Sequence, residues 1–172
     1  MAVESAFAQA FLSIQARIKD QVPEIAWIDQ DLAQLEHYDV RPAVQFPCCL
    51  IDFINFTFKE MGDLDQWGEG TIQLRLGFAP FSSANSAAPL VSQEEALQYY
   101  ELENKVFKAL HGWIPEYGGV PITEPLIRTT AVSELRDDTF RVRVNHYTTA
   151  YEDGGAMPVR TTVKAALNIT PA

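Results

Sequence analysis

Two runs of alternating apolar and polar residues place the strongest constraint on the fold of this chain. The first runs from Cys49 to Glu60 and the second from Thr71 to Phe78. Because successive side chains on a strand point to opposite faces, each run predicts a strand with one apolar face. The turn residues between them, from Met61 to Gly70, predict that the two strands form a long antiparallel hairpin. The alternation slips in phase near Phe53, which indicates a β-bulge.

A helix is predicted on each side of this hairpin. The first spans about Ser5 to Gln21 and is followed by Pro23. The second begins at Ser92, which matches a capping box with Glu95, and is closed by Gly112. Each helix carries one apolar stripe at helical spacing. The stripe residues are Phe7, Phe11, Ile14 and Ile18 in the first helix and Tyr99, Leu102, Val106, Phe107 and Leu110 in the second.

Two further strands are predicted in the second half of the chain. They span Leu126 to Leu135 and Thr139 to Tyr151, on either side of Asp137 and Asp138. The order helix, hairpin, helix, hairpin lacks a βαβ rhythm and shows no internal repeat. We therefore expect an α+β fold, with an antiparallel sheet built from two long hairpins and two main helices packed on one face of it.

The remaining segments are less regular. Ile25 to Ile28 is consistent with a short strand, Asp29 to Val40 carries a weak helical pattern, and Phe81 to Pro89 resembles a flexible connection or an exposed arm. We expect residues 1–172 to form a single domain with an extended C-terminal tail from about residue 154. That tail could add a strand over Val159 to Ile169 or extend to a neighbouring chain.

Composition excludes several functional classes. The chain has 172 residues and a net charge of -10, from 13 Lys and Arg against 23 Asp and Glu. A protein of this charge repels phosphate backbones, which disfavours tight binding of nucleic acid. No window approaches about 18 uninterrupted apolar residues, and the N-terminus lacks a basic signal-like start. The sequence therefore predicts a cytoplasmic protein with no membrane partner.

Residues that often carry chemistry are present but not in catalytic or metal-binding patterns. The histidines His37, His111 and His146 lie far apart, and the adjacent Cys48 and Cys49 would point to opposite faces of a strand. No nucleophile elbow, dinucleotide fingerprint or phosphate loop occurs. We predict no catalytic, cofactor-binding or metal-binding residues and no cofactor.

One segment begins like a calcium-binding loop. Asp63 and Asp65 occupy its first and third positions and Gly68 its sixth, but Trp67 stands at the fifth and Leu74 at the place of the bidentate glutamate. A hairpin tip is the better interpretation. Other carboxylates are interpreted as turn residues and solvated ends; these are Asp137, Asp138, Glu152 and Asp153.

Aromatic residues offer a further alternative. Several could line a pocket for a small ligand, although aromatic residues at this spacing more often belong to a core or an interface. They are Tyr99, Tyr100, Trp113, Tyr117, Tyr147 and Tyr151. Exposed sheet edges and a long hairpin tip are better suited to joining copies of the chain, because unpaired backbone groups recruit another strand. Self-assembly is therefore the favoured use.

Four short segments of the second half carry a family resemblance. HGWIPE at 111–116, EPLIRTT at 124–130, SELRDD at 133–138 and HYTTAYED at 146–153 resemble the tail terminator, or tail completion, proteins of long-tailed bacteriophages and prophages. The order of helices and hairpins over about Ser5 to Asp153 is also similar. The long Ser- and Ala-rich connection and the tail after Gly155 depart from that pattern, which leaves open a related neck or tube protein.

The resemblance implies a structural virion protein of the tail or neck, assembled in the host cytoplasm. Such a protein forms a homo-oligomeric ring, commonly a hexamer, that caps the tail tube protein and offers a surface to the head-tail connector or neck protein. DNA passes through the lumen of such a ring without specific binding. The alternative is a small-molecule-binding or enzymatic α+β domain without a recognisable motif, and a measured oligomer mass would separate the two.

Overall fold

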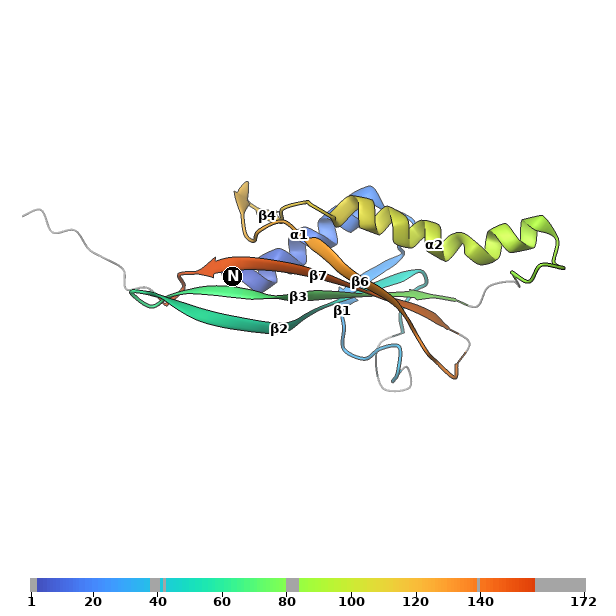
Figure 1. Cartoon of the computed structure of the whole chain (residues 1–172), viewed down its shortest axis with the longest axis horizontal. Helices are drawn as coiled ribbons and strands as arrows, with labels where there is room; N and C mark the ends of the chain where they lie inside the picture. Colours follow the sequence, from blue (N-terminus) through green and yellow to red (C-terminus); the bar gives the residue numbers. More distant parts are fainter. Residues whose placement is uncertain (1–2, 38–40, 42, 80–83, 139, 157–172) are drawn as a thin grey trace, which may run out of the picture.

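The computed structural model describes residues 3–37, 41, 43–79, 84–138 and 140–156. It confirms the predicted α+β class (Figure 1). Two helices accompany a mostly antiparallel sheet of five strands, which differ in length. The helices are α1 (Ala6–Gln21) and α2 (Leu90–Leu110). The strands of the sheet are β1 (Trp27–Gln30), β2 (Cys48–Gly62), β3 (Asp65–Phe78), β6 (Ile127–Glu134) and β7 (Arg141–Asp153). A separate small ribbon pairs β4 (Glu116–Tyr117) with β5 (Val120–Pro121).

Two antiparallel hairpins form most of the sheet, as the alternating patterns predict. The strand order is β1-β2-β3-β7-β6, so that the two hairpins lie side by side and β3 pairs with β7 over the whole length from Gln66 to Phe78. The expectation of a purely antiparallel sheet is wrong at one edge, because β1 pairs in parallel with β2. The weak helical pattern after β1 forms no helix in its described part, which is a turn over residues 32–36.

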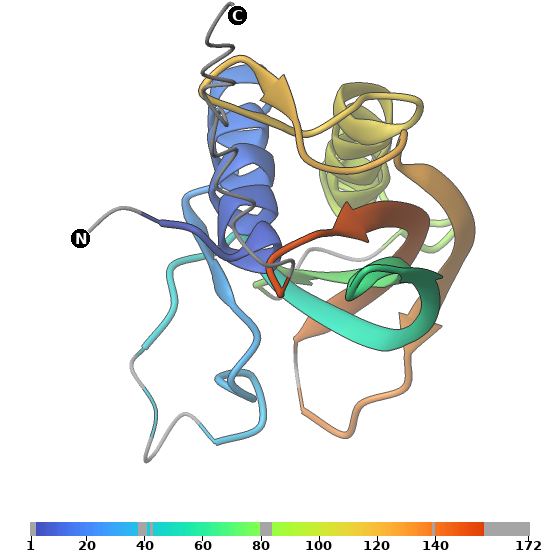
Figure 2. The ribbon, with the colours of Figure 1, turned by 90° about the vertical axis from the view of Figure 1, so that its left-hand side faces the viewer.

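Both helices cover one face of the sheet, as expected (Figure 2). Ile14 and Ile18 of α1 and Val106 of α2 are almost fully buried against this face. They pack on the even-numbered apolar residues of β3, which the alternation of that strand directs toward the helices. Those residues are Ile72, Leu74, Leu76 and Phe78.

The hairpin of β2 and β3 is longer and its turn tighter than predicted. The strands continue to Gly62 and Asp65, so the interpretation of residues 61–70 as a turn is wrong for most of that segment. Gly62, Asp63 and Leu64 all have positive φ, which makes the tight reversal possible. The predicted bulge is present, but it lies at Asn55, where the pairing shifts between Ile54 and Thr57.

The N-terminus of α2 differs from the predicted capping box. The helix begins at Leu90 after Pro89, so Ser92 and Glu95 lie inside it and no side chain caps its first turn. Its C-terminus is as predicted, because Gly112 has a φ of 76° that ends the helix. The described part of the connection before α2, residues 84–89, is mostly exposed, and the predicted tail strand at 159–169 lies outside the described residues.

Among the described residues, the second face of the sheet is covered at one end. The chain between β1 and β2 crosses this face and buries Leu35 against Cys48, Leu50 and Val142. The rings of Phe46 and Phe140 stack at the rim, with centroids 4.8 Å apart. The sheet therefore has a complete core beneath its helices and a smaller one on the opposite side.

Candidate assembly surfaces

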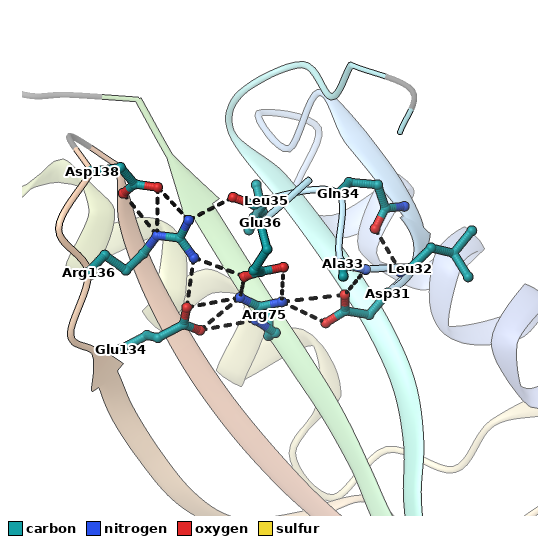
Figure 3. A network of polar contacts seen from close by, with 10 residues as sticks. All are labelled: Asp31, Leu32, Ala33, Gln34, Leu35, Glu36, Arg75, Glu134, Arg136 and Asp138. Carbon is teal, nitrogen blue, oxygen red and sulfur yellow. Dashed lines mark hydrogen bonds and ion pairs between the residues drawn. The ribbon is translucent and has the colours of Figure 1, made fainter. Parts of the chain in front are cut away.

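Two arginines and four carboxylates form a network on the face of the sheet opposite the helices (Figure 3). Arg75 projects from the middle of β3, and Arg136 projects from the turn after β6. The carboxylates are Asp31 and Glu36, which follow β1, Glu134 at the end of β6, and Asp138 in the turn before β7.

Arg75 is the centre of this network and is only 8% exposed. Its Nη1 lies 3.1 Å from an oxygen of Asp31, and its Nη2 lies 2.9 Å from an oxygen of Glu134 and also binds Glu36. Arg136 binds Glu36 and Glu134 from the other side, at 2.9 and 2.7 Å. Two chain segments that are far apart in sequence are thereby fixed to one sheet face.

Charge pairing in the network shifts several pKa values. The hydrogen bond from Arg75 lowers the pKa of Glu36, and the one from Arg136 lowers the pKa of Asp138. Burial alone would lower the pKa of Arg75, but its hydrogen bond to Glu36 and the charge of Asp31 outweigh this effect and raise it. Glu36, Asp138 and Arg75 are therefore held in their charged forms, and the six side chains of the network bind one another within the protein. We interpret the network as structural.

The β1 edge of the sheet is closed by side chains. The backbone N–H groups of Trp27 and Asp31 donate to carbonyls on the β2 side of the strand. The backbone N–H and C=O groups of Ile28 and Gln30, which lie between them, therefore face outward. Gln15 of α1 donates to the carbonyl of Ile28 at 2.9 Å. Gln30 donates its N–H to the side chain of Asp29, and its carbonyl accepts a hydrogen bond from Gln34, both at 2.8 Å. Another strand would have to displace these bonds to pair here.

The β6 edge is open over most of its length. Its beginning is covered, because the N–H of Arg128 donates to Nδ1 of His111 at 3.1 Å, and Leu126 exchanges backbone bonds with Gly112 and Trp113. From Thr129 to Glu134, the described residues show no partner for the backbone groups that point away from β7. These six residues offer unpaired donors and acceptors over about 20 Å of strand.

A partly apolar stripe of α2 lies beside this open edge. Arg143 of β7 lies over Tyr100, and Arg128 of β6 lies over Phe107 with its guanidinium carbon 3.8 Å from the ring centroid. Leu97, one turn before Tyr100, continues the stripe, and both side chains are about 45% exposed. The edge of the sheet and the stripe together form a shelf that we call the β6 shelf, defined by Thr129–Glu134, Leu97, Tyr100 and Phe107.

The tip of the β2–β3 hairpin lies at the opposite end of the molecule from the N-terminal half of α2 (Figure 1). Met61 and Leu64 at the tip are 62% and 58% exposed. Near it, the pKa of Glu152 is raised by a hydrogen bond to the neighbouring carboxylate of Asp65 and by the negative charge of that group. Asp63 and Asp65, which begin like a calcium loop in the sequence but are interpreted as part of a hairpin tip, both lie at this tip. The described residues hold no group of three or more potential metal ligands.

The three histidines are not brought together. His111 caps the start of β6 and stacks on Phe107, with ring centroids 4.9 Å apart. His146 lies on the other sheet face between Thr130 and Gln73, 2.8 and 3.0 Å from their oxygens. His37 lies in the segment after β1, where its backbone continues a turn with Ala33.

Both cysteines are buried free thiols, on opposite faces of β2 as predicted. Burial raises the pKa of Cys48 to about 11 and raises that of Cys49 as well. A thiol with a raised pKa carries little thiolate at neutral pH, and the thiolate is the reactive form. These residues therefore belong to the core.

The aromatic candidates line no common pocket. Tyr99 is buried against Phe78 and Arg141, while Tyr151 belongs to a cluster with Phe7 and Phe56 near the hairpin. Tyr147 lies in the main core, and Trp113 packs against the edge of that core. Tyr117 is exposed in the small ribbon. A groove of about 710 Å³ lies elsewhere, between α1 and β1, and includes Leu12, Gln15 and Trp27.

Sequence reasoning missed the arginine network and the difference between the two sheet edges. The only local signal for Arg75 is its polar position between Leu74 and Leu76 in an alternating strand. Among the described residues, neither helix combines the length and apolar character needed to cross a membrane.

No protein-family model matches the sequence, and no curated protein sequence matches it. The fold does have a counterpart among solved structures. A chain described as belonging to the virion of a native gene transfer agent (GTA) particle superposes with a TM-score of 0.51. The two chains are 8% identical, and the superposition covers 88% of this chain and 100% of that chain. The likeness is one of fold.

Proposed function

We propose that this chain is a structural protein of a phage-like particle, located in the tail or neck. In this proposal it forms a ring, most simply of six copies, that caps the tail tube and joins it to the head connector. The observation that carries the proposal is the fold shared over 88% of the chain with a virion chain of a gene transfer agent particle. The resemblance of the 111–153 segments to tail terminator proteins supports the same assignment.

The shape of the described surfaces suits such a ring. A head-to-tail ring needs two different surfaces on each copy, because each copy contacts its two neighbours through different faces. One sheet edge is open at Thr129–Glu134 and the other is closed by its own side chains. This asymmetry favours a contact that repeats in one direction. We assign the chain no catalytic, cofactor-binding or metal-binding residues, and we propose that residues 1–172 make one domain.

The net charge of -10 is also compatible with a ring around DNA. An acidic lumen repels phosphates and lets DNA pass, whereas a basic lumen would retain it. The partners in this proposal are other copies of the chain, the tail tube protein and the connector or neck protein.

Tail tubes offer the direct test. The purified chain is added to the tail tube protein of the same particle, and the tube ends are imaged by negative-stain microscopy while the oligomer mass is measured in solution. We expect capped tubes of fixed length, with a discrete ring at one end. Tubes that grow uncapped in the presence of excess chain contradict the proposal. A monomer that takes up a small molecule in the 710 Å³ groove would instead support the ligand-binding alternative.

A further inference from the structure

The β6 shelf has the open backbone edge that a strand from a partner could pair with. Its outward backbone groups from Thr129 to Glu134 have no partner among the described residues, and Val132 beside them is 50% exposed. The closed β1 edge of another copy is a poor partner, because Gln15, Asp29 and Gln34 already occupy its backbone groups. An extended segment with one apolar face is a better match.

The C-terminal segment of this chain has that pattern. From Val159 to Ile169 the sequence reads VRTTVKAALNI, and its odd-numbered positions are Val, Thr, Val, Ala, Leu and Ile. The even-numbered positions include Arg160 and Lys164. This is the period-2 alternation of a half-buried strand. Eleven residues extend over about 36 Å, which is enough to cover the six open residues of β6.

We propose that residues 159–169 of one copy pair as a sixth strand with the open β6 edge of a neighbouring copy. The odd-numbered apolar side chains then lie against Leu97, Tyr100 and Phe107 of α2, and the even-numbered face turns away from the helices. This inference rests on the proposed function, since it names the contact that joins neighbouring subunits of the ring. Each copy gives one strand and receives one, so the contact is heterologous and can close a ring.

The position of the end of β7 favours a neighbouring copy over the same copy. Asp153 pairs with Gln66 near the hairpin tip, whereas the open part of β6 pairs with Val142 to His146. Those two places are separated by about 24 Å along β7, and residues 154–158 span at most about 17 Å. Glu124, which donates its N–H to the carbonyl of Ala150 at 2.7 Å, also lies beside β7 on that path. Within one copy, about the first two or three residues of the strand would therefore be used to reach the shelf, which leaves fewer of them to pair with it.

The local charge of residues 157–172 suits a contact with a neighbouring copy. Residues 157–172 contain two of the thirteen basic residues, Arg160 and Lys164, and none of the twenty-three acidic residues. The rest of the chain therefore has a more negative net charge than the whole chain. A positively charged segment therefore meets an acidic neighbour, which reduces the repulsion between subunits.

A truncation is the first test. The chain ending at Ala156 should keep its thermal melting temperature, because the buried core lies within the described residues, and should lose the ring in solution and on tube ends. A second variant, Val163→Asp, places a charge on the apolar face of the strand and should also lose the ring. Thr162→Asp, on the other face, is the matched control and should retain it.

Crosslinking then identifies the partner. Chains carrying Ala131→Cys, at the open edge, are mixed with chains carrying Thr162→Cys or Val163→Cys and treated with a short bismaleimide, which tolerates shifts in register. Because Ala131 shares a strand face with one of the two tail positions, one mixture should give a chain-to-chain crosslink. Leu64→Cys, which is 58% exposed at the far hairpin tip, replaces Ala131→Cys as control and should give several-fold less. The unmodified chain, whose two cysteines are buried, should give none.

Each result decides between the two proposals. Crosslinks between different chains, together with loss of the ring on truncation, support strand donation. In a chain that carries both Ala131→Cys and Val163→Cys, crosslinks that form only within one chain overturn it in favour of pairing within a copy. A truncated chain that still forms the ring also overturns it and leaves the ring proposal intact. Failure of the full chain to form a ring on tube ends overturns the proposed function itself.

Discussion

Arg75 shows how a single residue can organise one face of this protein. It is 8% exposed and binds carboxylates that come from the two edges of the sheet, Asp31 and Glu36 after β1 and Glu134 at the end of β6. Burial of a charge is costly unless it is paired, and removing one partner leaves the others without compensation. The network therefore acts as a single unit in which the arginine is essential.

Arg75→Met should destabilise the fold by about 3–5 kcal/mol, because it leaves Asp31, whose side chain is only 9% exposed, without a cation. Chemical denaturation followed by circular dichroism measures the loss. Lys59→Met removes the same charge from an exposed position of β2 and should cost less than about 0.5 kcal/mol. Equal effects of the two substitutions would mean that the network contributes only through the net charge of the protein.

Glu36 should make the stability of the protein sensitive to acid. Its hydrogen bond from Arg75 lowers its pKa in the folded state, so its contribution is present above the unfolded pKa of about 4.3 and is lost as pH falls through the lower folded value. In Glu36→Gln this group no longer titrates. The melting temperature of that variant should be lower near neutral pH and should fall less than that of the parent between about pH 5 and pH 2. If the melting temperatures of the two proteins fell equally with pH, the lowered pKa of Glu36 would be contradicted.

At the scale of the elements, the β2–β3 hairpin depends on close packing at its bulge. Asn55 has a φ of 55°, and the bulge places Phe56 over Gly70 of the partner strand. A Cβ atom at Gly70 would lie 2.4 Å from Phe56 Cγ, so glycine is needed there for space. Phe56 in turn packs on Phe7 of α1, which connects the hairpin to the helix.

Gly70→Ala should therefore cost about 1–3 kcal/mol through overpacking against Phe56. Gly155→Ala is the control, because the nearest atom to its added Cβ is a carboxylate oxygen of Asp153 at 3.1 Å, and it should cost less than about 0.5 kcal/mol. Urea unfolding curves of both variants measure the difference. If Gly70→Ala were neutral, the Phe56 ring would have to be free to move away.

Helix α1 offers a matched pair of aliphatic residues on its two sides. Ile14 is fully buried in the main core, whereas Leu12 is 38% exposed beside the α1–β1 groove. Ile14→Ala should cost about 2–5 kcal/mol, because it removes buried methyl groups and leaves a cavity. Leu12→Ala should cost less than about 1 kcal/mol, because its side chain is only partly removed from water. Thermal melts of both variants check this ranking, and a reversed order would show that the helix buries a different face.

At the scale of the whole molecule, net charge opposes any assembly of identical copies. Each copy carries a net charge of -10, and this value already includes the two positive charges of residues 157–172. Like charges on neighbouring subunits repel one another over about 10 Å at 0.1 M salt and over a shorter range as salt rises. The apolar and backbone contacts that would join copies are much less sensitive to salt.

Ring formation should therefore become stronger as sodium chloride rises from about 0.05 M to about 0.5 M, because repulsion between copies is screened. Sedimentation velocity across a salt series measures the fraction of chain in the ring. A net-neutral protein of the same mass serves as a control for effects of density and viscosity. Rings that dissociate as salt rises would show that ion pairs between copies, rather than strand pairing, provide most of the binding energy.

Two pairs of exposed apolar residues lie at opposite ends of the long axis of the molecule. Met61 and Leu64 lie at the hairpin tip, and Leu90 and Val91 lie at the start of α2 at the other end (Figure 1). A chain of a gene transfer agent virion has a similar fold at 8% sequence identity, so the fold itself does not depend on one particular set of side chains.

The amino-acid sequence by itself determined the elements with a strong local period. The alternation at Thr71–Phe78 predicts β3, and the spacing of Ile14 and Ile18 predicts the buried face of α1, because the repeat of a strand or helix is set by its own backbone geometry. The α+β class follows from the order of those elements. Boundaries were less accurate, since turns and caps depend on single residues such as Gly62 and Pro89.

Only the tertiary structure decided which segments meet. The parallel pairing of β1 with β2, the network of Arg75 and the closure of one sheet edge by Gln15 depend on contacts between distant parts of the chain. Arg75 meets Asp31 and Glu134 across separations of 44 and 59 residues. No local period encodes such contacts, because they arise only when the hairpins dock side by side. The open edge of β6 is set in the same way, by the end of the covering segment at His111–Trp113.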